Sequence, residues 1–299
     1  MKTAAALSGF DPSAQASFPG MTIEAAARPF LKWAGGKGKL LSAILPYVPP
    51  NIQNYHEPFL GSGAVFFALA PRVSGTSHLC DLNDELVNVW LAVRDHPDKL
   101  LADVRSFAGY DRQEDYYRVR EEQPTCPYRR AARFIFLNQT AWNGLWRVNK
   151  HGIFNVPWGN RPFRGLDASI IHAASRVLSN AAIDHLDFRE AIARAKAGDF
   201  VYLDPPYLPA SDTSKFCFYT KKRFLAPDLE ELASLCEKMT SDGINWMMSN
   251  RDNGRIQQLF AHAKIVSFKT WRSVSAPNKR DVQPTSSPEV IVVGGPAWR

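Results

Sequence analysis

The sequence has 299 residues, of which 45% are hydrophobic and 22% are charged, and its 36 basic and 29 acidic residues give a net charge of +7. These proportions are typical of a soluble globular protein and exclude a wholly disordered chain. No stretch approaches the roughly 20 apolar residues that a membrane-spanning helix needs, so we expect a cytoplasmic protein without a membrane span. The length fits one large domain or two small ones.

The cysteines and the N-terminal segment show no pattern of a metal site, a disulfide framework or a signal peptide. The four cysteines form no C-x-x-C pair and do not cluster with histidine, so a zinc site or a disulfide framework is disfavoured and no metal is expected. Residues 1–27 are rich in Ala, Ser and Pro and contain no apolar run of the length found in signal peptides. We expect this segment to be a flexible tail.

Apolar spacing and glycine turns predict an α/β start. The first expected elements are a helix over 37–48, a strand ending at Glu57, a glycine turn over 58–63, a helix over 64–70 and a strand over 77–80 that ends at Asp81. A strand, a glycine turn, a helix and a second strand ending in an acid are typical of the first half of a doubly wound sheet.

The middle of the chain, residues 83–180, is predicted to be mainly helical. After it, strands and helices are again predicted to alternate. The expected later elements are a strand from about Ala182, helices near 189–196, 227–240 and 253–261, and strands over 200–203, 244–248, 264–271 and 289–293. The pattern therefore predicts an α/β sheet domain from residues 28–82 and 181–299, interrupted by a helical insertion.

A long acid-free stretch lies within that insertion. Residues 129–164 contain seven basic and seven aromatic side chains and no Asp or Glu. Cations neutralise phosphates and flat rings stack on bases, so the composition suits nucleic acid. Taken alone, it fits equally well a solvated helix face with core aromatics.

The most specific motif is Asp204-Pro205-Pro206-Tyr207, which follows a hydrophobic strand. Ligands bind at the carboxyl ends of strands in open α/β sheets, and the two prolines make the loop rigid. The Asp204 carboxylate and the Pro205 carbonyl can accept both N–H groups of a planar exocyclic amine, while Tyr207 stacks on the attached ring. Such a clamp favours a pyramidal nitrogen whose lone pair points at an electrophile. The alternative is a turn in which Asp204 is only a cap.

Four blocks of the chain occur in the order typical of one enzyme family: residues 30–37 (FLKWAGGK), 57–63 (EPFLGSG), 138–159 and 204–207 (DPPY). Over residues 29–295 the chain resembles the Dam-type DNA adenine-N6 methyltransferases. The resemblance implies a Rossmann-like class I methyltransferase sheet with an inserted target-recognition domain at 83–180, S-adenosylmethionine as methyl donor and double-stranded DNA as partner. It implies no obligate protein partner, and it leaves open a cognate restriction endonuclease that acts separately.

The resemblance assigns donor-binding positions. These are Trp33, Lys37, Phe59, Gly61, Gly63, Asp81, Asp187, Phe188 and Asp204. Asp81 is expected at the ribose hydroxyls, or alternatively as a helix N-cap, and Asp187 at the adenine amine, where Asp184 is a competitor. Phe188 fits the adenine or the core equally well. The glycines are expected to let the backbone approach the donor, and the GGKGKL segment lacks the form of a nucleoside triphosphate loop.

The segment 142–157 resembles the family's target-reading hairpin. By this resemblance Arg147 reads a guanine, since its fork matches O6 and N7. The other DNA-contacting positions are Lys32 at an outer base pair, Leu145 and Pro157 at thymine, Trp142 at the gap left by an extruded base, Asn143 at a base edge or at the orphan base, and Asn149 and Asn155. These equivalences imply a 5′-GATC site, although a DNA-facing loop at 272–280 departs from the family pattern.

Two other functions would use the same motif. One is methylation of a planar amine in RNA or on a glutamine side chain, and the other is a catalytically silent DNA-binding protein. The basic-aromatic insertion and Arg147 favour DNA over protein as substrate, and the intact D-P-P-Y sequence disfavours the silent protein.

Overall fold

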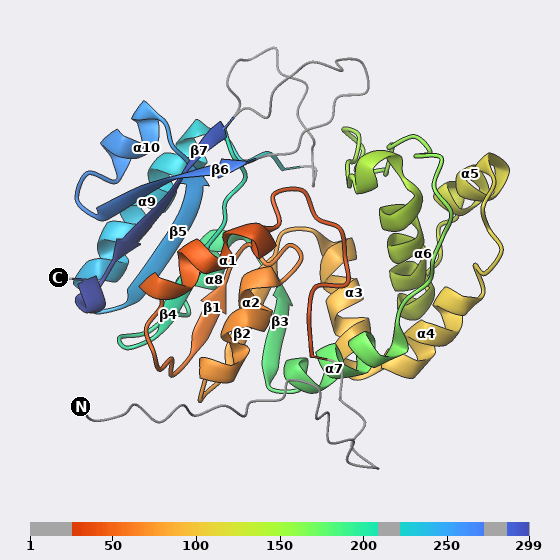
Figure 1. Cartoon of the computed structure of the whole chain (residues 1–299), viewed down its shortest axis with the longest axis horizontal. Coiled ribbons are helices and arrows are strands. Elements are labelled where there is room, and N and C mark those ends of the chain that lie inside the picture. The colour runs from red at the N-terminus through yellow and green to blue at the C-terminus, as the bar shows by residue number, and fades with distance from the viewer. Residues whose placement is uncertain (1–25, 209–221, 272–285, 299) are drawn as a thin grey trace, which may run out of the picture.

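The computed structural model describes residues 26–208, 222–271 and 286–298 (Figure 1). Most of the expected tail, Cys217 and the expected DNA-facing loop at 272–280 therefore lie outside the described residues. In the described parts of the chain, no helix combines the length and the apolar character that would let it cross a membrane.

The described residues form one seven-stranded sheet. Its strands are β1 (Tyr55–Glu57), β2 (Ser77–Asp81), β3 (Ala181–His185), β4 (Phe200–Leu203), β5 (Asn245–Arg251), β6 (Lys264–Trp271) and β7 (Ser286–Gly294). Their order is β3-β2-β1-β4-β5-β7-β6, and β7 runs antiparallel between β5 and β6, whereas β1 to β5 are mutually parallel. The strand order reverses between β1 and β4, where open α/β sheets form their ligand crevice. This arrangement confirms the Rossmann-like methyltransferase fold.

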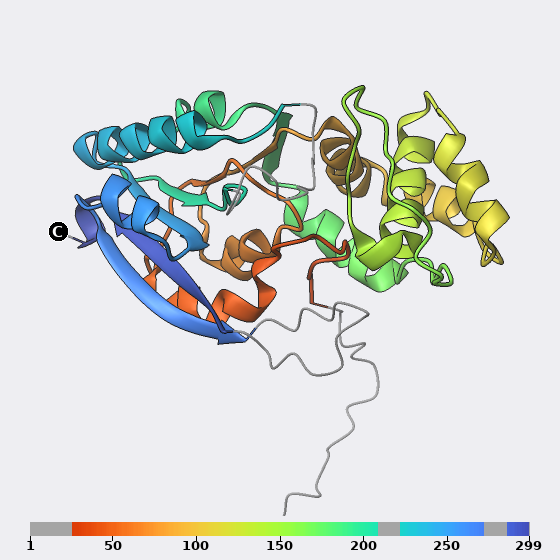
Figure 2. The same cartoon turned by 90° about the horizontal axis from the view of Figure 1, so that it is seen from above.

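Helices cover both faces of the sheet, and this explains why β4 is apolar throughout. Val201 and Leu203 point to the face covered by α8 (Phe188–Ile192), α9 (Ala226–Ser241) and α10 (Gly254–Leu259), whereas Phe200 and Tyr202 belong to the core that includes α2 (Ala64–Leu69). The alternation follows from the two-residue period of a strand. Figure 2 shows α9 and α2 on opposite sides of the sheet.

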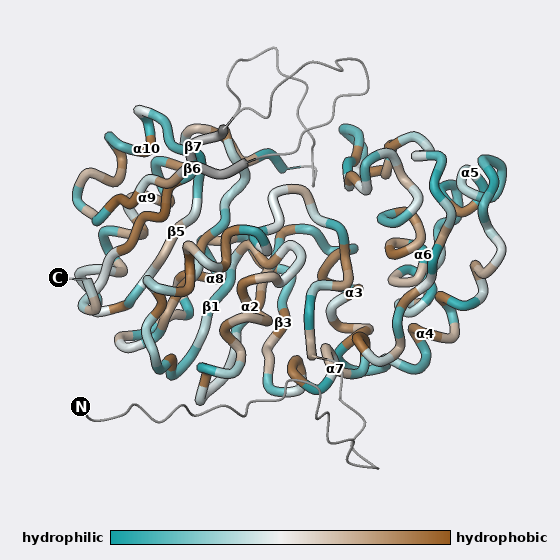
Figure 3. Tube along the Cα trace, viewed as in Figure 1, coloured by the Kyte–Doolittle hydropathy of each residue, from teal (hydrophilic) through white to brown (hydrophobic). Residues whose placement is uncertain are grey.

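Five helices lie between β2 and β3, as the sequence predicts: α3 (Asp84–Asp95), α4 (Pro97–Arg105), α5 (Gln113–Glu121), α6 (Pro127–Thr140) and α7 (Ala168–Leu178). Helix α3 packs against α6 and α7 and also contacts β2 and β3, so one continuous apolar core runs from the sheet into the helices. In Figure 3, α2 is apolar along much of its length, whereas α5, at the far edge of the molecule, is largely hydrophilic.

Two predicted helices differ in extent. The helix expected over 37–48 is an α-helical turn, α1 (Leu41–Ile44), between two 3-10 turns, η1 (Lys37–Leu40) and η2 (Leu45–Tyr47). Pro46 lacks the N–H that a longer α-helix would need, so the regular helix ends before it. The helix expected near 189–196 ends at Ile192, and it begins at Phe188 because the Asp187 side chain accepts from Arg189 N and caps it.

Candidate active site

A cavity of about 1020 Å³ lies at the carboxyl ends of the parallel strands. The structure brings most of the predicted site residues to its wall: Trp33, Lys37, Phe59, Gly61, Asp81, Arg147, Asn149, Asn155, Asp187, Phe188, Asp204, Pro205, Pro206 and Tyr207. The remaining predicted residues do not line it; they are Lys32, Gly63, Trp142, Asn143, Leu145 and Pro157.

The D-P-P-Y loop follows β4, and its acid is paired with a lysine from the N-terminal block. Lys37 Nζ lies 2.5 Å from Asp204 Oδ1 and also donates to the Gly35 carbonyl at 2.9 Å. The lysine side chain is 4% exposed and that of Asp204 is 22% exposed. Burial raises the pKa of Asp204 above its ordinary value, and Lys37 opposes this rise. Lys37 therefore contacts the acid of the motif as well as lining the cavity.

Two further hydrogen bonds hold this loop against neighbouring strands. Ser249 on β5 donates to Asp204 Oδ1 at 3.3 Å and also pairs with the Tyr202 hydroxyl at 2.8 Å. The Tyr207 hydroxyl donates to Glu289 Oε2 on β7 at 2.7 Å. The loop is thus connected to two strands that follow it in the chain.

The glycine turn after β1 needs glycine for packing, which the sequence did not indicate; its expected approach to the donor stays a prediction. Gly61 and Gly63 have φ values of 49° and 64°, which favour glycine. A Cβ on Gly61 would lie 2.7 Å from the Trp33 ring, and one on Gly63 would lie 2.7 Å from the Trp90 ring. Packing against these indole rings, together with the positive φ, requires glycine here, whatever ligand the turn approaches.

Two acids at the ends of β1 and β2 lie at this turn, Glu57 buried and Asp81 partly buried. Asp81 accepts from Gly61 N at 3.0 Å and from Asn83 N at 2.9 Å, so it holds the turn in place. The helix N-cap is Asn83 and not Asp81, because the Asn83 side chain accepts from Leu86 N. Burial raises the pKa of Glu57 to about 8, against the opposing hydrogen bond from the Tyr55 hydroxyl at 2.7 Å.

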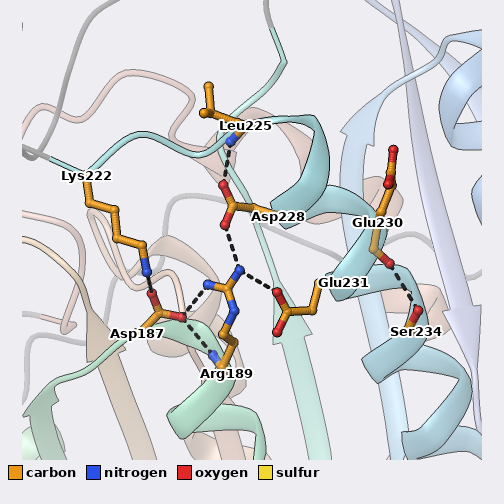
Figure 4. A network of polar contacts seen from close by, with 8 residues as sticks. All are labelled: Asp187, Arg189, Lys222, Leu225, Asp228, Glu230, Glu231 and Ser234. Atoms are coloured by element: carbon orange, nitrogen blue, oxygen red, sulfur yellow. Dashed lines mark hydrogen bonds and ion pairs between the residues drawn. The ribbon is translucent and has the colours of Figure 1, made fainter.

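Asp187 also lines the cavity and lies within a network centred on Arg189 (Figure 4). Its carboxylate accepts from Arg189 Nη1 at 2.9 Å and from Lys222 Nζ at 2.6 Å. Arg189 also reaches Asp228 at 2.7 Å and Glu231 at 2.6 Å on α9. Burial alone would raise the pKa of Asp187, but these hydrogen bonds outweigh it, so the pKa lies below its ordinary value.

The structure also distinguishes Asp184 from Asp187 and locates the Phe188 ring. Asp184 pairs with Arg194 at 2.6 Å and does not line the cavity, whereas Asp187 does. The Phe188 ring stacks on Phe59 with centroids 5.6 Å apart and is 5% exposed, so it belongs to the core and also forms part of the cavity wall.

The segment after α6 forms the expected hairpin. Backbone hydrogen bonds join Trp142 N to the Pro157 carbonyl, Asn155 N to the Arg147 carbonyl and Asn149 N to the Ile153 carbonyl, at 2.9 to 3.1 Å. Side chains alternate along both strands, as in a two-residue period. One side is buried: Trp146, Phe154 and Val156 belong to the apolar core, and Val148 lines the cavity. The more exposed side carries the predicted DNA-contacting residues Leu145, Arg147, Asn149, Asn155 and Pro157.

The guanidinium of Arg147 is held in place from the opposite strand of this hairpin. Its Nε donates to Asn155 Oδ1 at 2.8 Å and its Nη2 donates to the Asn155 carbonyl at 3.1 Å. Trp142 is 42% exposed at the base of the hairpin, next to Asn143, whose φ is 53°. Lys32 is tied to the same region because Asn138 bonds both its N–H and its carbonyl.

Comparison with known proteins identifies the family. Residues 33–274 match the D12 class N6 adenine-specific DNA methyltransferases. The chain belongs to this family. A type II methyltransferase of Methanocaldococcus jannaschii, M.MjaIII, is 37% identical over 80% of this chain and 91% of its own length. The type II methyltransferase M1.LlaDCHI of Lactococcus lactis subsp. cremoris is 34% identical, and the DNA adenine methylase of Escherichia coli K12 is 33% identical, each over 83% of this chain and 90% of its own length.

Membership makes this chain an enzyme, an adenine-specific DNA methyltransferase, and implies S-adenosylmethionine as its methyl donor and DNA as its substrate. For this methyltransferase, sequence reasoning missed several side chains at the site, among them Glu57, Arg189, Ser249 and Glu289. Glu289 had a signal in the sequence, because it is a lone acid at the start of the apolar run 290–293. Ser249 had none, since serine is common in strands and loops alike.

Proposed function

We propose that this chain transfers a methyl group from S-adenosylmethionine to N6 of an adenine that is extruded from duplex DNA, at 5′-GATC sites. The single observation that carries the proposal is that Asp204 and Arg147 line the same cavity. A residue suited to a base amine and a residue suited to a guanine edge thus face one space, although they come from the sheet and from the helical insertion. We further propose that residues 83–180 form the target-recognition part, that 28–82 and 181–299 form the catalytic part, and that the enzyme works in the cytoplasm.

Asp204 and the Pro205 carbonyl hold the two N–H groups of the target amine. This geometry draws the nitrogen lone pair out of the ring and directs it toward the donated methyl group. The methylated amine is strongly acidic, so its proton can leave without a strong base. The Lys37 ammonium stabilises the carboxylate form of Asp204, which is the form that accepts hydrogen bonds. Tyr207 stacks on the extruded base.

The residues on the cavity wall suit the donor. A cavity of about 1020 Å³ is at the upper end of the range for small-molecule sites, which leaves room for a donor and a base together. Asp187 and Phe188 would hold the donor's adenine, and Asp81 the ribose hydroxyls. Trp33 and the turn at Gly61 would contact the methionine portion. The bound donor supplies an electrophilic methyl group on a sulfonium.

The exposed side of the hairpin would enter the major groove. Arg147 is pre-oriented by Asn155, and a bidentate contact to guanine O6 and N7 contributes about 1–3 kcal/mol of discrimination. Leu145 and Pro157 would contact a thymine methyl group. Extrusion of the adenine costs a few kcal/mol, and Trp142 would fill the gap.

The test is single-molecule mapping of methyladenine in DNA from methylation-deficient cells that express the wild type, Asp204→Ala or Asp184→Asn. We expect N6-methyladenine at GATC in the wild type and in Asp184→Asn, whose carboxylate lies outside the cavity. We expect none with Asp204→Ala, which should still bind the donor. Methylation at another sequence would refute the GATC site, and turnover by Asp204→Ala would refute the role of Asp204.

A further inference from the structure

Glu289 is a buried acid whose carboxylate lies at the active site. It is 1% exposed, and its Oε2 accepts from the Tyr207 hydroxyl at 2.7 Å. The residues that follow it on β7 are apolar and fully buried: Val290, Ile291, Val292 and Val293. A carboxylate buried in an apolar strand destabilises the fold unless it is paired.

The position of Glu289 in the sheet fixes the position of its carboxylate. It pairs with Arg251 on β5 and with Phe268 on β6, so a neighbouring strand flanks it on either side. Its backbone therefore cannot shift without breaking two antiparallel ladders. A fixed carboxylate beside a loop is well suited to orient that loop.

Tyr207 is also contacted by the cation of the site. Lys37 Nζ lies 5.4 Å from the centroid of the Tyr207 ring, within the range of a cation–π interaction, while the same atom bonds Asp204. The ring is therefore held at its hydroxyl by Glu289 and over its face by Lys37. Its orientation is coupled to the position of the carboxylate that binds the amine.

We propose that Glu289 is a positioning residue for the target base: it fixes the Tyr207 ring in the orientation in which the extruded adenine stacks. This inference rests on the proposed function, because it assumes that a base enters the cavity. It assigns no direct contact between Glu289 and the base.

The experiment uses the full chain and two duplexes, one with the target adenine for methylation rates and a matched one with 2-aminopurine at that position for fluorescence, because 2-aminopurine has no 6-amino group to methylate. Four variants are compared: Glu289→Leu, Glu289→Gln, Tyr207→Phe and the double variant Glu289→Leu/Tyr207→Phe. A strong hydrogen bond to a charged acceptor is lost in Glu289→Leu, so we expect the single-turnover methylation rate to fall about 10- to 100-fold. The donor dissociation constant should stay within about twofold of the wild-type value. The fluorescence of the extruded 2-aminopurine should change, because its stacking partner is reoriented.

Glu289→Gln keeps an acceptor oxygen, so it should recover part of the rate. The methylation rate of the double variant should lie within about twofold of the rate of Tyr207→Phe, because both substitutions break the same hydrogen bond. Asp252→Asn is the matched control: it removes one negative charge from the end of β5, where the carboxylate accepts from Ser267 and Gln257, and it should behave as wild type.

Three outcomes in the variants would overturn the inference, and one in the wild type would overturn the proposed function as well. Independent, multiplicative losses in the double variant, or unchanged 2-aminopurine fluorescence in Glu289→Leu, would overturn it. A loss in Glu289→Leu that follows only a lower melting temperature, with no rescue by Gln, would overturn it as well. If the wild type itself neither extrudes 2-aminopurine nor methylates adenine, the proposed function fails and the inference fails with it.

Discussion

The amino group of Lys37 lies 2.5 Å from the carboxylate of Asp204, although 167 positions of the chain separate them. The N-terminal block and the D-P-P-Y loop thus meet in one ion pair, with the whole helical insertion between them in sequence. Because the lysine is almost fully buried, this pair is screened much less than a surface pair would be.

Replacing Lys37 by methionine should shift the acidic limb of the pH–rate profile to higher pH. Lys37 lowers the pKa of Asp204, so without it this pKa rises further and the carboxylate forms only at higher pH. An opposite charge at this distance is worth at least about one pH unit, so activity at pH 6 should fall more than activity at pH 9. The exposed Lys39 of the same turn gives the control, Lys39→Met. An unmoved acidic limb in Lys37→Met would show that the pair does not set the charge of Asp204.

Replacing Arg147 by alanine should relax discrimination at one guanine of the site. The guanidinium that Asn155 orients is lost, so discrimination should fall by the equivalent of about 1–3 kcal/mol at that base pair. Methylation rates on duplexes with each single substitution in the site measure the effect. Arg161→Ala, which changes an exposed cation of the same basic stretch, should weaken binding to all duplexes alike. Equal losses on every duplex with Arg147→Ala would argue against base reading.

Replacing Arg189 by methionine should raise the KM for the methyl donor and change kcat little. Arg189 holds Asp187 and joins it to α9, and its guanidinium lies 4.3 Å over the Phe188 ring. Because Arg189 is partly exposed, its hydrogen bonds are weakened by solvent, and we expect the KM for the donor to rise about five- to thirtyfold. Arg255→Met is the control. Arg255, on α10, pairs with Glu230, which lies on α9 like two partners of Arg189, and neither residue lines the cavity. Arg189→Lys should recover part of the affinity. A fall in kcat at unchanged KM would contradict the assignment.

Replacing Gly61 by alanine should destabilise the fold by about 2–4 kcal/mol, since it combines a strained φ with overpacking against Trp33. Gly109→Ala isolates the first effect, because its φ is 84° and a Cβ added there would meet no atom of the described residues within 4 Å. It should cost only about 1–2 kcal/mol. Urea unfolding of the two variants gives the comparison. Equal losses would show that the Trp33 contact contributes nothing.

Local patterns predicted the strands and the D-P-P-Y loop, because each depends on a short period or on a turn that its own residues determine. The hairpin around Arg147 was expected from the family resemblance and not from a local pattern. The pairing of Tyr207 with Glu289 was not predictable in this way. It depends on the register of β7 between two other strands, which long-range packing decides and no short window of sequence contains. The reason for Gly61 escaped prediction similarly, since the Trp33 ring arrives from an earlier block.

The parallel pairing of β1 with β4 also has a kinetic consequence. Asn54 and Asp199, which lie just before the two strands and bond each other at 2.9 Å, are 145 positions apart. Closing so large a loop is entropically unfavourable, whereas α3 to α7 contact one another across shorter stretches of the chain, all within residues 84–178. We expect the helices to assemble first during refolding and to bring the strand ends together. Hydrogen exchange should therefore protect α6 before it protects β4.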